Sequence, residues 1–292
     1  MNKEGTIPVE GGNVWYTIVG ADRKGIPLMV LHGGPGVPHD YLDPLKALAA
    51  QRPVIFYDQL GCGNSEHPSD RSLWTLERFV GELKQVRAFL KLDRMHLLGQ
   101  SWGAMLAVSY LLREKPEGVL SLILSAPYLS TPPWIQDQQK LIDRLSPESR
   151  QNIRTCEAEE NYDSPAYQSA MQEFYEKHVC RISPWPDCLK RSIEKIGMDV
   201  YLYMWGPSEF TMTGTLKEVD LTEKLRFIGQ TVLLTCGEFD EATPETTRLY
   251  QQHFQNATLY MFPGASHEHH LEYTQEYLLV VSGFIQEQEQ LS

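Results

Sequence analysis

The most reactive arrangement in the sequence is a serine held between two glycines. Gly99-Gln100-Ser101-Trp102-Gly103 fits the pattern G-x-S-x-G, in which a sharp turn between a strand and a helix exposes the serine hydroxyl as a nucleophile. The preceding Met95–Leu98 is apolar, as in a buried strand, and helical spacing follows to about Arg113. This setting predicts that Ser101 attacks a carbonyl carbon. The structural alternative is a serine that only caps the helix.

A serine nucleophile needs a base, and the base needs an acid that orients it. In enzymes built on this turn the order along the chain is serine, acid, histidine. The apolar segment Thr231–Thr235 leads into a loop that holds Glu238 and Asp240. By position alone, both carboxylates are candidates for the acid.

The base is expected on the loop after the next apolar segment, Ala257–Phe262. His267 comes first on that loop, directly after a Gly-Ala-Ser turn, whereas His269 and His270 are expected to begin the following helix. Order and placement therefore favour His267.

A second glycine-rich turn supplies the expected anion-binding element. His32-Gly33-Gly34-Pro35-Gly36 follows the apolar segment Pro27–Leu31, and a turn at this place donates a backbone N–H to the oxyanion in enzymes with the G-x-S-x-G turn. We expect the N–H groups of Gly34 and Trp102 to stabilise the negative charge of a tetrahedral intermediate. A plain tight turn of glycine and proline is the alternative reading.

The elements that must position these residues alternate along the chain. Strands are expected at 14–19, 27–31, 54–57, 95–98, 119–124, 231–235 and 257–262, and helices at 75–92, 102–113, 245–253 and 271–288. Strands that are apolar on both faces and separated by helices predict a mostly parallel central sheet covered on both sides, which is an α/β fold.

The alternation stops near Pro127 and returns near Leu225. Between them strand patterns are absent, and prolines separate helical segments rich in tyrosine and tryptophan, whose rings need a surface to pack on. We therefore predict one catalytic domain formed by residues 1–126 and 226–292, and a helical cap (lid) inserted at 127–225.

Charge and composition limit the classes of molecule that the protein is expected to bind. The 292 residues include 38 acidic and 26 basic ones, for a net charge of −12. Nucleic-acid binders and proteins that dock on anionic membranes need a basic face, so neither class is expected.

The cysteines and the first residues indicate in which cellular compartment the protein is expected. The five cysteines form no C-x-x-C pair; Cys180 and Cys188 could pair, but reduced thiols are favoured. Met1–Gly5 lacks the apolar stretch of a secretion signal, and no apolar run approaches the roughly 20 residues that cross a bilayer. A cytoplasmic protein is expected.

With these motifs in place, the chain resembles the proline iminopeptidase (prolyl aminopeptidase) family of α/β-hydrolase serine peptidases, near the tricorn-interacting aminopeptidase and the lactic-acid-bacterial enzymes. The similarity covers nearly the whole chain. It rests on the His32–Gly36 and Gly99–Gly103 motifs, and on the segments Asp58–Ser65, Trp205–Phe210, Gly237–Pro244 and the loop ending at His267.

The resemblance implies an α/β-hydrolase fold and a role for each matching residue. Ser101 would be the nucleophile, His267 the base and Asp240 the acid, which decides between Asp240 and Glu238. Gly34 and Trp102 would form the oxyanion hole. No metal or organic cofactor is implied.

The resemblance also implies a site for the substrate's free amino terminus. The matching carboxylates are Glu209 and Glu241, and Tyr201 matches a tyrosine that assists them. The sequence Glu268-His269-His270 departs from the family because it is more polar, so the pocket is expected to differ there. Cys62 is expected near enough to the site for a bulky thiol reagent to block access.

The predicted function is therefore release of N-terminal residues, preferably proline, from short peptides with a free N-terminus. An amino-acid amidase, a broad aminopeptidase or an esterase would use the same triad. A non-catalytic binding protein with this fold is the third reading, since fold alone does not establish function.

Overall fold

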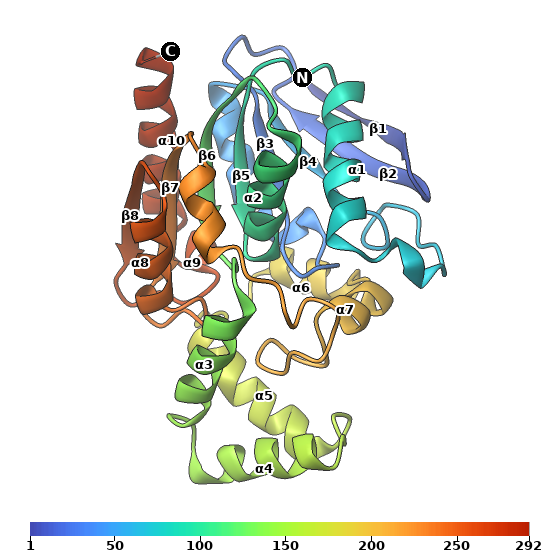
Figure 1. The fold of residues 1–292 in the computed structure, drawn as a ribbon, viewed down its shortest axis with the longest axis vertical. Helices are drawn as coiled ribbons and strands as arrows, with labels where there is room; N and C mark the ends of the chain where they lie inside the picture. Colours follow the sequence, from blue (N-terminus) through green and yellow to red (C-terminus); the bar gives the residue numbers. More distant parts are fainter. Residues whose placement is uncertain (292) are drawn as a thin grey trace.

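The computed structural model describes residues 1–291, and its centre is an eight-stranded sheet (Figure 1). The strand order is β1-β2-β4-β3-β5-β6-β7-β8. Pairs from β4 to β8 are parallel, whereas β1 pairs with β2, and β2 with β4, in antiparallel fashion. The strands are β1 (Asn2–Val9), β2 (Gly12–Val19), β3 (Leu28–Leu31), β4 (Val54–Tyr57), β5 (Met95–Gln100), β6 (Val119–Ser125), β7 (Thr231–Gly237) and β8 (Ala257–Phe262).

Both faces of the parallel strands β3 to β7 are buried, as the apolar strands predicted, whereas edge strand β8 is partly exposed. Along β3 the side chains alternate: Met29 and Leu31 join one core, and Leu28 and Val30 join the other. Helices of the first core are α1 (Leu76–Phe89), α2 (Trp102–Glu114) and α8 (Pro244–His253); those of the second are the 3₁₀ segment η1 (His39–Ala50) and α10 (Thr274–Gln290). This is the predicted α/β-hydrolase architecture.

Five helices lie between β6 and β7 and gather beyond one end of the sheet (Figure 1). Prolines begin several of them: Pro147 and Pro165 are first helical residues, and the hydroxyls of Ser146 and Ser164 accept N–H bonds of the first turn. The first three of these helices share a small core of their own around Tyr167. The five helices are α3 (Thr131–Ile142), α4 (Pro147–Ala158), α5 (Pro165–His178), α6 (Asp187–Glu194) and α7 (Met198–Met204).

The structure differs from the predicted elements in three places. The predicted helix 271–288 is two helices, α9 (His269–Glu272) and α10, which are separated at Tyr273, where φ is −127°. Strand β1 was not predicted, because an edge strand with mostly exposed side chains lacks an apolar pattern. Segment η1 was also missed. The remaining short elements are η2 (Arg71–Leu73) and η3 (Thr222–Phe227). Ser292, the last residue of the predicted catalytic segment, lies outside the described residues.

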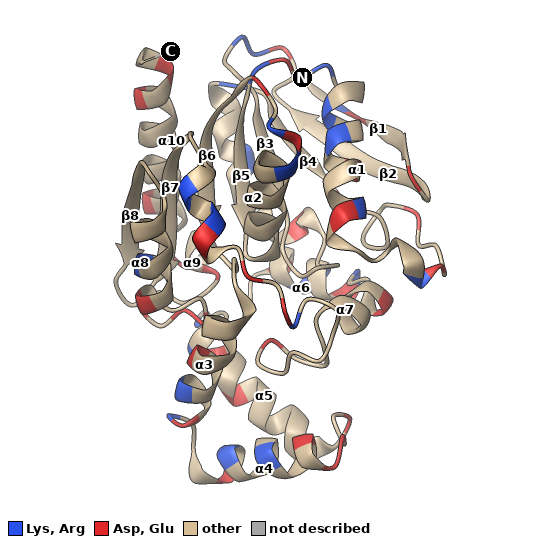
Figure 2. Cartoon of the chain, in the orientation of Figure 1, with Lys and Arg blue, Asp and Glu red and all other residues tan. Residues whose placement is uncertain are grey.

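Charged residues of both signs are interspersed over the fold, for example along α4 (Figure 2). Within residues 1–291, no helix combines the length and the apolar character needed to cross a bilayer. All five cysteines are unpaired in the structure.

The two glycines of the G-x-S-x-G turn allow the backbones of three elements to touch. A Cβ on Gly99 would lie 2.2 Å from the carbonyl oxygen of Gly103, and a Cβ on Gly103 would lie 2.2 Å from that of Leu31. Strands β3 and β5 and the start of α2 therefore meet at a point where no side chain fits. This contact fixes Ser101 relative to the end of β3.

We expect Gly103→Ala to destabilise the protein by at least ~3 kcal/mol, the upper part of the range for overpacking, because the added methyl group meets backbone that cannot rotate away. Urea unfolding followed by circular dichroism would measure the change. The matched control is Gly81→Ala in α1, where a Cβ meets nothing within 4 Å. This change should raise the free energy of unfolding by about 0.5–1 kcal/mol. Equal stability of Gly103→Ala and the parent protein would contradict this account.

Candidate active site

Ser101 lies at the tip of the turn between β5 and α2. Its φ is 53°, a left-handed conformation that few non-glycine residues adopt, and strain of this kind is typical of functional positions. Its side chain makes no capping hydrogen bond to α2, so Ser101 does not serve as a cap of this helix. The residue is 5% exposed and lines an internal cavity.

Asp240 and His267 meet on the loops that follow β7 and β8. The Nδ1 atom of His267 lies 2.8 Å from Oδ1 of Asp240. The aspartate is itself held by the backbone N–H groups of Gly237 and Ala242, at 3.1 and 2.8 Å. A carboxylate fixed in this way holds the imidazole ring in one orientation. Glu238, the other candidate acid, is exposed and accepts the N–H of Gly264 instead.

The opposite nitrogen of His267 faces a further carboxylate. Nε2 lies 3.7 Å from Oε1 of Glu241. Burial lowers the pKa of His267, but the charges of Asp240 and then Glu241 outweigh burial and raise this pKa to about 10.

The Gly34 turn lies beside Ser101 and lines the same cavity. Gly34 has φ of 103°, and a Cβ there would lie 2.5 Å from the backbone nitrogen of Gly36. Trp102 begins α2, so its N–H belongs to the first turn, which has no acceptor within the helix. Both expected oxyanion donors therefore start from backbone that is free to bind an anion.

Tyr41 and Gln100, whose role no sequence pattern indicates, support the Gly34 turn by hydrogen bonds. The N–H of Gly33 donates to the Tyr41 hydroxyl at 2.7 Å, and that hydroxyl donates to Oε1 of Gln100 at 2.6 Å. The chain of bonds links the turn to the residue before Ser101. Because Tyr41 lies in η1, a segment with no clear pattern in the sequence, only the fold could place it here.

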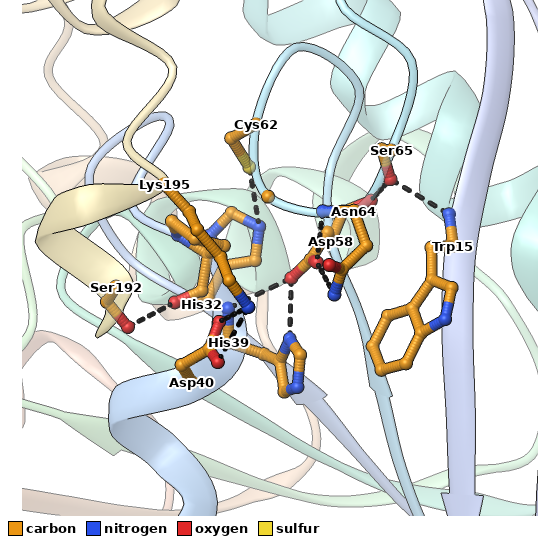
Figure 3. Close-up of polar contacts among 12 residues, drawn as sticks. Trp15, His32, His39, Asp40, Asp58, Cys62, Asn64, Ser65, Ser192 and Lys195 are labelled. Atoms are coloured by element: carbon orange, nitrogen blue, oxygen red, sulfur yellow. Dashed lines mark hydrogen bonds and ion pairs between the residues drawn. The ribbon is translucent and has the colours of Figure 1, made fainter. Parts of the chain in front are cut away.

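The segment Asp58–Ser65 forms a buried polar network behind the turn (Figure 3). Asp58 accepts two hydrogen bonds from His39 and two from Asn64. Gln59 donates its N–H to Nε2 of His32 and accepts from the indole N–H of Trp102, each at 2.9 Å. The network therefore joins the strand that precedes the Gly34 turn to the first residue of α2.

Cys62 belongs to this network and not to the cavity wall. It is fully buried, and its Sγ lies 3.5 Å from Nε2 of His32 (Figure 3). Burial raises the pKa of its thiol well above the usual range, which makes it a poor nucleophile. A bulky thiol reagent would reach it only after this loop opened, so the block of access stays a prediction.

A cavity of about 230 Å³ connects these groups to the inserted helices. Its wall is largely apolar, with three glutamates. The lining residues are Gly34, Val37, Tyr41, Gln100, Ser101, Met171, Tyr175, Val179, Trp185, Leu189, Ile193, Ile196, Met198, Tyr201, Pro207, Glu209, Glu241, His267 and Glu268. A small apolar cavity with a few polar groups is the usual form of a small-molecule site.

Glu209, Glu241 and Tyr201 all reach this cavity. The Tyr201 hydroxyl donates to Oε1 of Glu209 at 2.7 Å. Both carboxylate oxygens of Glu241 are buried and have no hydrogen-bond partner within residues 1–291. Burial raises the pKa of Glu241 well above its usual range, and it also raises the pKa of Glu209. Ionised carboxylates are costly to bury without a partner, and the raised pKa values reflect this cost.

Glu268 was noted in the sequence only as a departure from the family, and the structure places it on the cavity wall. Its backbone N–H donates to the carbonyl oxygen of Val179 at 2.8 Å, and that of His267 donates to His178 at 3.0 Å. The ring of His178 in turn lies 2.8 Å from the carbonyl oxygen of Phe239. The end of α5 therefore contacts both loops that carry Asp240 and His267.

We expect a fluorophosphonate, which reacts with activated serines, to label Ser101 in a one-to-one ratio. The mass of the intact protein would show the adduct, and Ser101→Ala should remove it. Asp240→Asn should slow labelling by up to about 10⁴-fold, because the imidazole loses its correct tautomer. Ser282, on α10, does not line the cavity and is a control position: Ser282→Ala should label like the parent. Labelling that survives Ser101→Ala would rule out Ser101 as the nucleophile.

Comparison with known proteins agrees with this geometry. Residues 26–273 match the family described as alpha/beta hydrolase fold. A proline iminopeptidase of Heyndrickxia coagulans is 44% identical over 286 residues, which cover 98% of this chain and 99% of the relative. A proline iminopeptidase of Lactiplantibacillus plantarum is 39% identical over 267 residues, with 89% and 92% covered.

A solved structure gives the same result in three dimensions. The crystal structure of the Mycobacterium smegmatis proline iminopeptidase superposes with a TM-score of 0.92 and 36% sequence identity, and the match covers 99% of each chain. Identity at this level over the full length confirms the resemblance drawn from the motifs, and the chain belongs to the proline iminopeptidase family of α/β hydrolases.

Proposed function

We propose that this protein is a serine aminopeptidase that releases N-terminal residues, preferably proline, from short peptides. The observation that carries the proposal is the pair of carboxylates, Glu209 and Glu241, on the wall of the cavity that holds Ser101. Membership in the proline iminopeptidase family supports the choice of proline. A cytoplasmic location fits the five unpaired thiols.

In the proposed mechanism Ser101 Oγ attacks the carbonyl carbon of the first residue while His267 Nε2 takes the hydroxyl proton. Asp240 holds the ring and stabilises the imidazolium that forms. The N–H groups of Gly34 and Trp102 bind the oxyanion. His267 then protonates the departing amine, and a water molecule activated by the same ring releases the amino acid from Ser101.

The two glutamates would select a free amino terminus. A protonated α-amine is a cation with several N–H donors, and it can bind both carboxylates at once. Glu209 uses one oxygen for Tyr201, which leaves its second oxygen and both oxygens of Glu241 for the substrate. A blocked or internal peptide would leave these charges buried and unpaired, which disfavours its binding.

We propose further that residues 127–225 act as a cap that limits substrate size. Helices α5 and α7 contribute Met171, Tyr175 and Tyr201 to the cavity wall. They cover a cavity of about 230 Å³ and would limit how much of a peptide can enter it together with the first residue. The proposed substrates are therefore short peptides whose remainder projects from the cavity.

A panel of arylamides tests the proposed activity. We expect prolyl 4-nitroanilide to be cleaved with a higher kcat/KM than the alanyl and leucyl analogues. N-acetylprolyl 4-nitroanilide should be at least about 30-fold slower than the free amine, since an unpaired buried charge costs about 2 kcal/mol or more. Equal turnover of the acetylated substrate would refute the exopeptidase assignment and favour a general amidase or esterase.

The role of Glu209 is tested by Glu209→Gln, which keeps the shape and removes the charge. We expect kcat/KM for prolyl 4-nitroanilide to fall, with a loss of roughly 2–4 kcal/mol of transition-state stabilisation. This is the range for removing one partner of a buried charge pair. The control is Glu218→Gln, an exposed carboxylate of the same inserted segment, which should stay close to the parent. If both variants behave alike, Glu209 does not bind the amine.

A further inference from the structure

In the free protein both nitrogens of His267 face carboxylates. Nδ1 lies 2.8 Å from Asp240 and Nε2 lies 3.7 Å from Glu241. Among residues 1–291, Nε2 makes no hydrogen bond to the Ser101 hydroxyl that it must deprotonate. The atom that serves as the base is therefore directed at an acid.

Glu241 and His267 hold one extra proton between them at neutral pH. The carboxylates raise the pKa of His267 to about 10, and burial raises the pKa of Glu241 well above its usual range. In the ion-paired form the proton lies on Nε2, where it occupies the lone pair that must accept the proton of Ser101. The 3.7 Å from Nε2 to Oε1 of Glu241 is an ion-pair distance and is too long for a hydrogen bond.

None of the neighbouring histidines adds a positive charge that could offset the carboxylates beside His267. Burial lowers the pKa of His178, and it lowers those of His269 and His270 to about 4 and about 3, so these rings are neutral. Glu209 and Glu268 face the cavity from the inserted segment and from the loop of His267. Burial raises the pKa of Glu268 to about 8 and also raises the pKa of Glu209. Among residues 1–291, the cavity lining thus holds three glutamates, and no lysine or arginine.

We infer that the ammonium group of the substrate activates the enzyme, by taking the place of the proton shared by Glu241 and His267. The inference rests on the proposed function and deepens it. When the ammonium binds Glu241 and Glu209, the glutamate becomes a charged partner of the substrate, and the new positive charge disfavours a protonated ring. One proton leaves the Glu241–His267 pair for solvent, the ammonium keeps its own, and Nε2 becomes free to accept the proton of Ser101.

This switch would act on chemistry as well as on binding. A neutral molecule of the same shape could enter the apolar cavity, but it would meet a base that is still protonated. Selection for a free amino terminus would then appear in kcat and in its dependence on pH. A site that only bound the ammonium would show selection in KM alone.

Proton release on binding is the direct test. Prolyl 4-nitroanilide is titrated at pH 7 into Ser101→Ala, which cannot turn it over, in buffers of different ionisation enthalpy. At this pH the substrate amine is largely protonated, so we expect more than half a proton, approaching about one, to be released for each molecule bound. Cyclopentanecarboxylic acid 4-nitroanilide, which lacks the ring nitrogen of proline, should release essentially no protons when it binds. The double variant Ser101→Ala/Glu241→Gln should also release essentially none when it binds the prolyl substrate.

The pH profile of kcat gives an independent measure. For 4-nitrophenyl cyclopentanecarboxylate we expect kcat of the parent protein to reach half its maximum at least one pH unit above the value for prolyl 4-nitroanilide. Glu241→Gln should lower the midpoint for the neutral ester by at least one unit and raise its kcat at pH 7 about fivefold or more. The control Glu245→Gln, an exposed glutamate four residues later, should keep the parent profile.

The outcomes separate the two proposals. Two outcomes overturn the switch and leave the aminopeptidase proposal intact. One is binding of the prolyl substrate to Ser101→Ala without proton release, while the parent protein cleaves it. The other is a Glu241→Gln variant that slows the ester at an unchanged midpoint. A parent protein that neither binds nor cleaves prolyl 4-nitroanilide overturns both.

Discussion

The rest of the site depends on the backbone contact between Gly103 and the end of β3. Because neither Gly99 nor Gly103 has a side chain, the strand that carries the Gly34 turn and the helix that carries Trp102 approach closely enough to act on one oxygen atom. Ser101 lies between these two glycines with a positive φ of 53° and lines the cavity. The positions of Ser101 and of the proposed oxyanion donors therefore follow from one packing constraint, and the loops after β7 and β8 only need to reach the same edge.

Electrostatics adds a second constraint, because the cavity gathers negative charge in an apolar setting. In most hydrolases of this type a single carboxylate orients the histidine. Here Glu241 and Glu268 follow Asp240 and His267 directly in the chain, and Glu209 approaches from the inserted helices. Burial raises the pKa of all three glutamates, so the free protein relieves this repulsion by holding protons. Under the proposed function, the ammonium group of the substrate would take the place of that protonation.

Much of this could be predicted from the sequence, because the features are local. The G-x-S-x-G turn, the Gly34 turn and the alternation of strands and helices each depend on residues that are neighbours in the chain. The supporting bonds from Tyr41 to Gln100 and from His178 to Phe239 join residues far apart in the sequence, so no local pattern reveals them. Edge strand β1 and the break at Tyr273 were missed for a related reason: solvent exposure hides the first, and one residue's backbone conformation decides the second.

The hydrogen bonds from the His267 loop to His178 and Val179 have a consequence for how this architecture can diversify. Inserted segments of hydrolases are often regarded as exchangeable modules that alter the pocket and leave the reaction centre alone. In this chain the end of α5 bonds to the backbone of the histidine itself, so a chimaera that received a foreign insertion would inherit a displaced base together with its new pocket. Substrate range and catalytic competence must therefore change together, which favours gradual substitution within the segment over wholesale replacement.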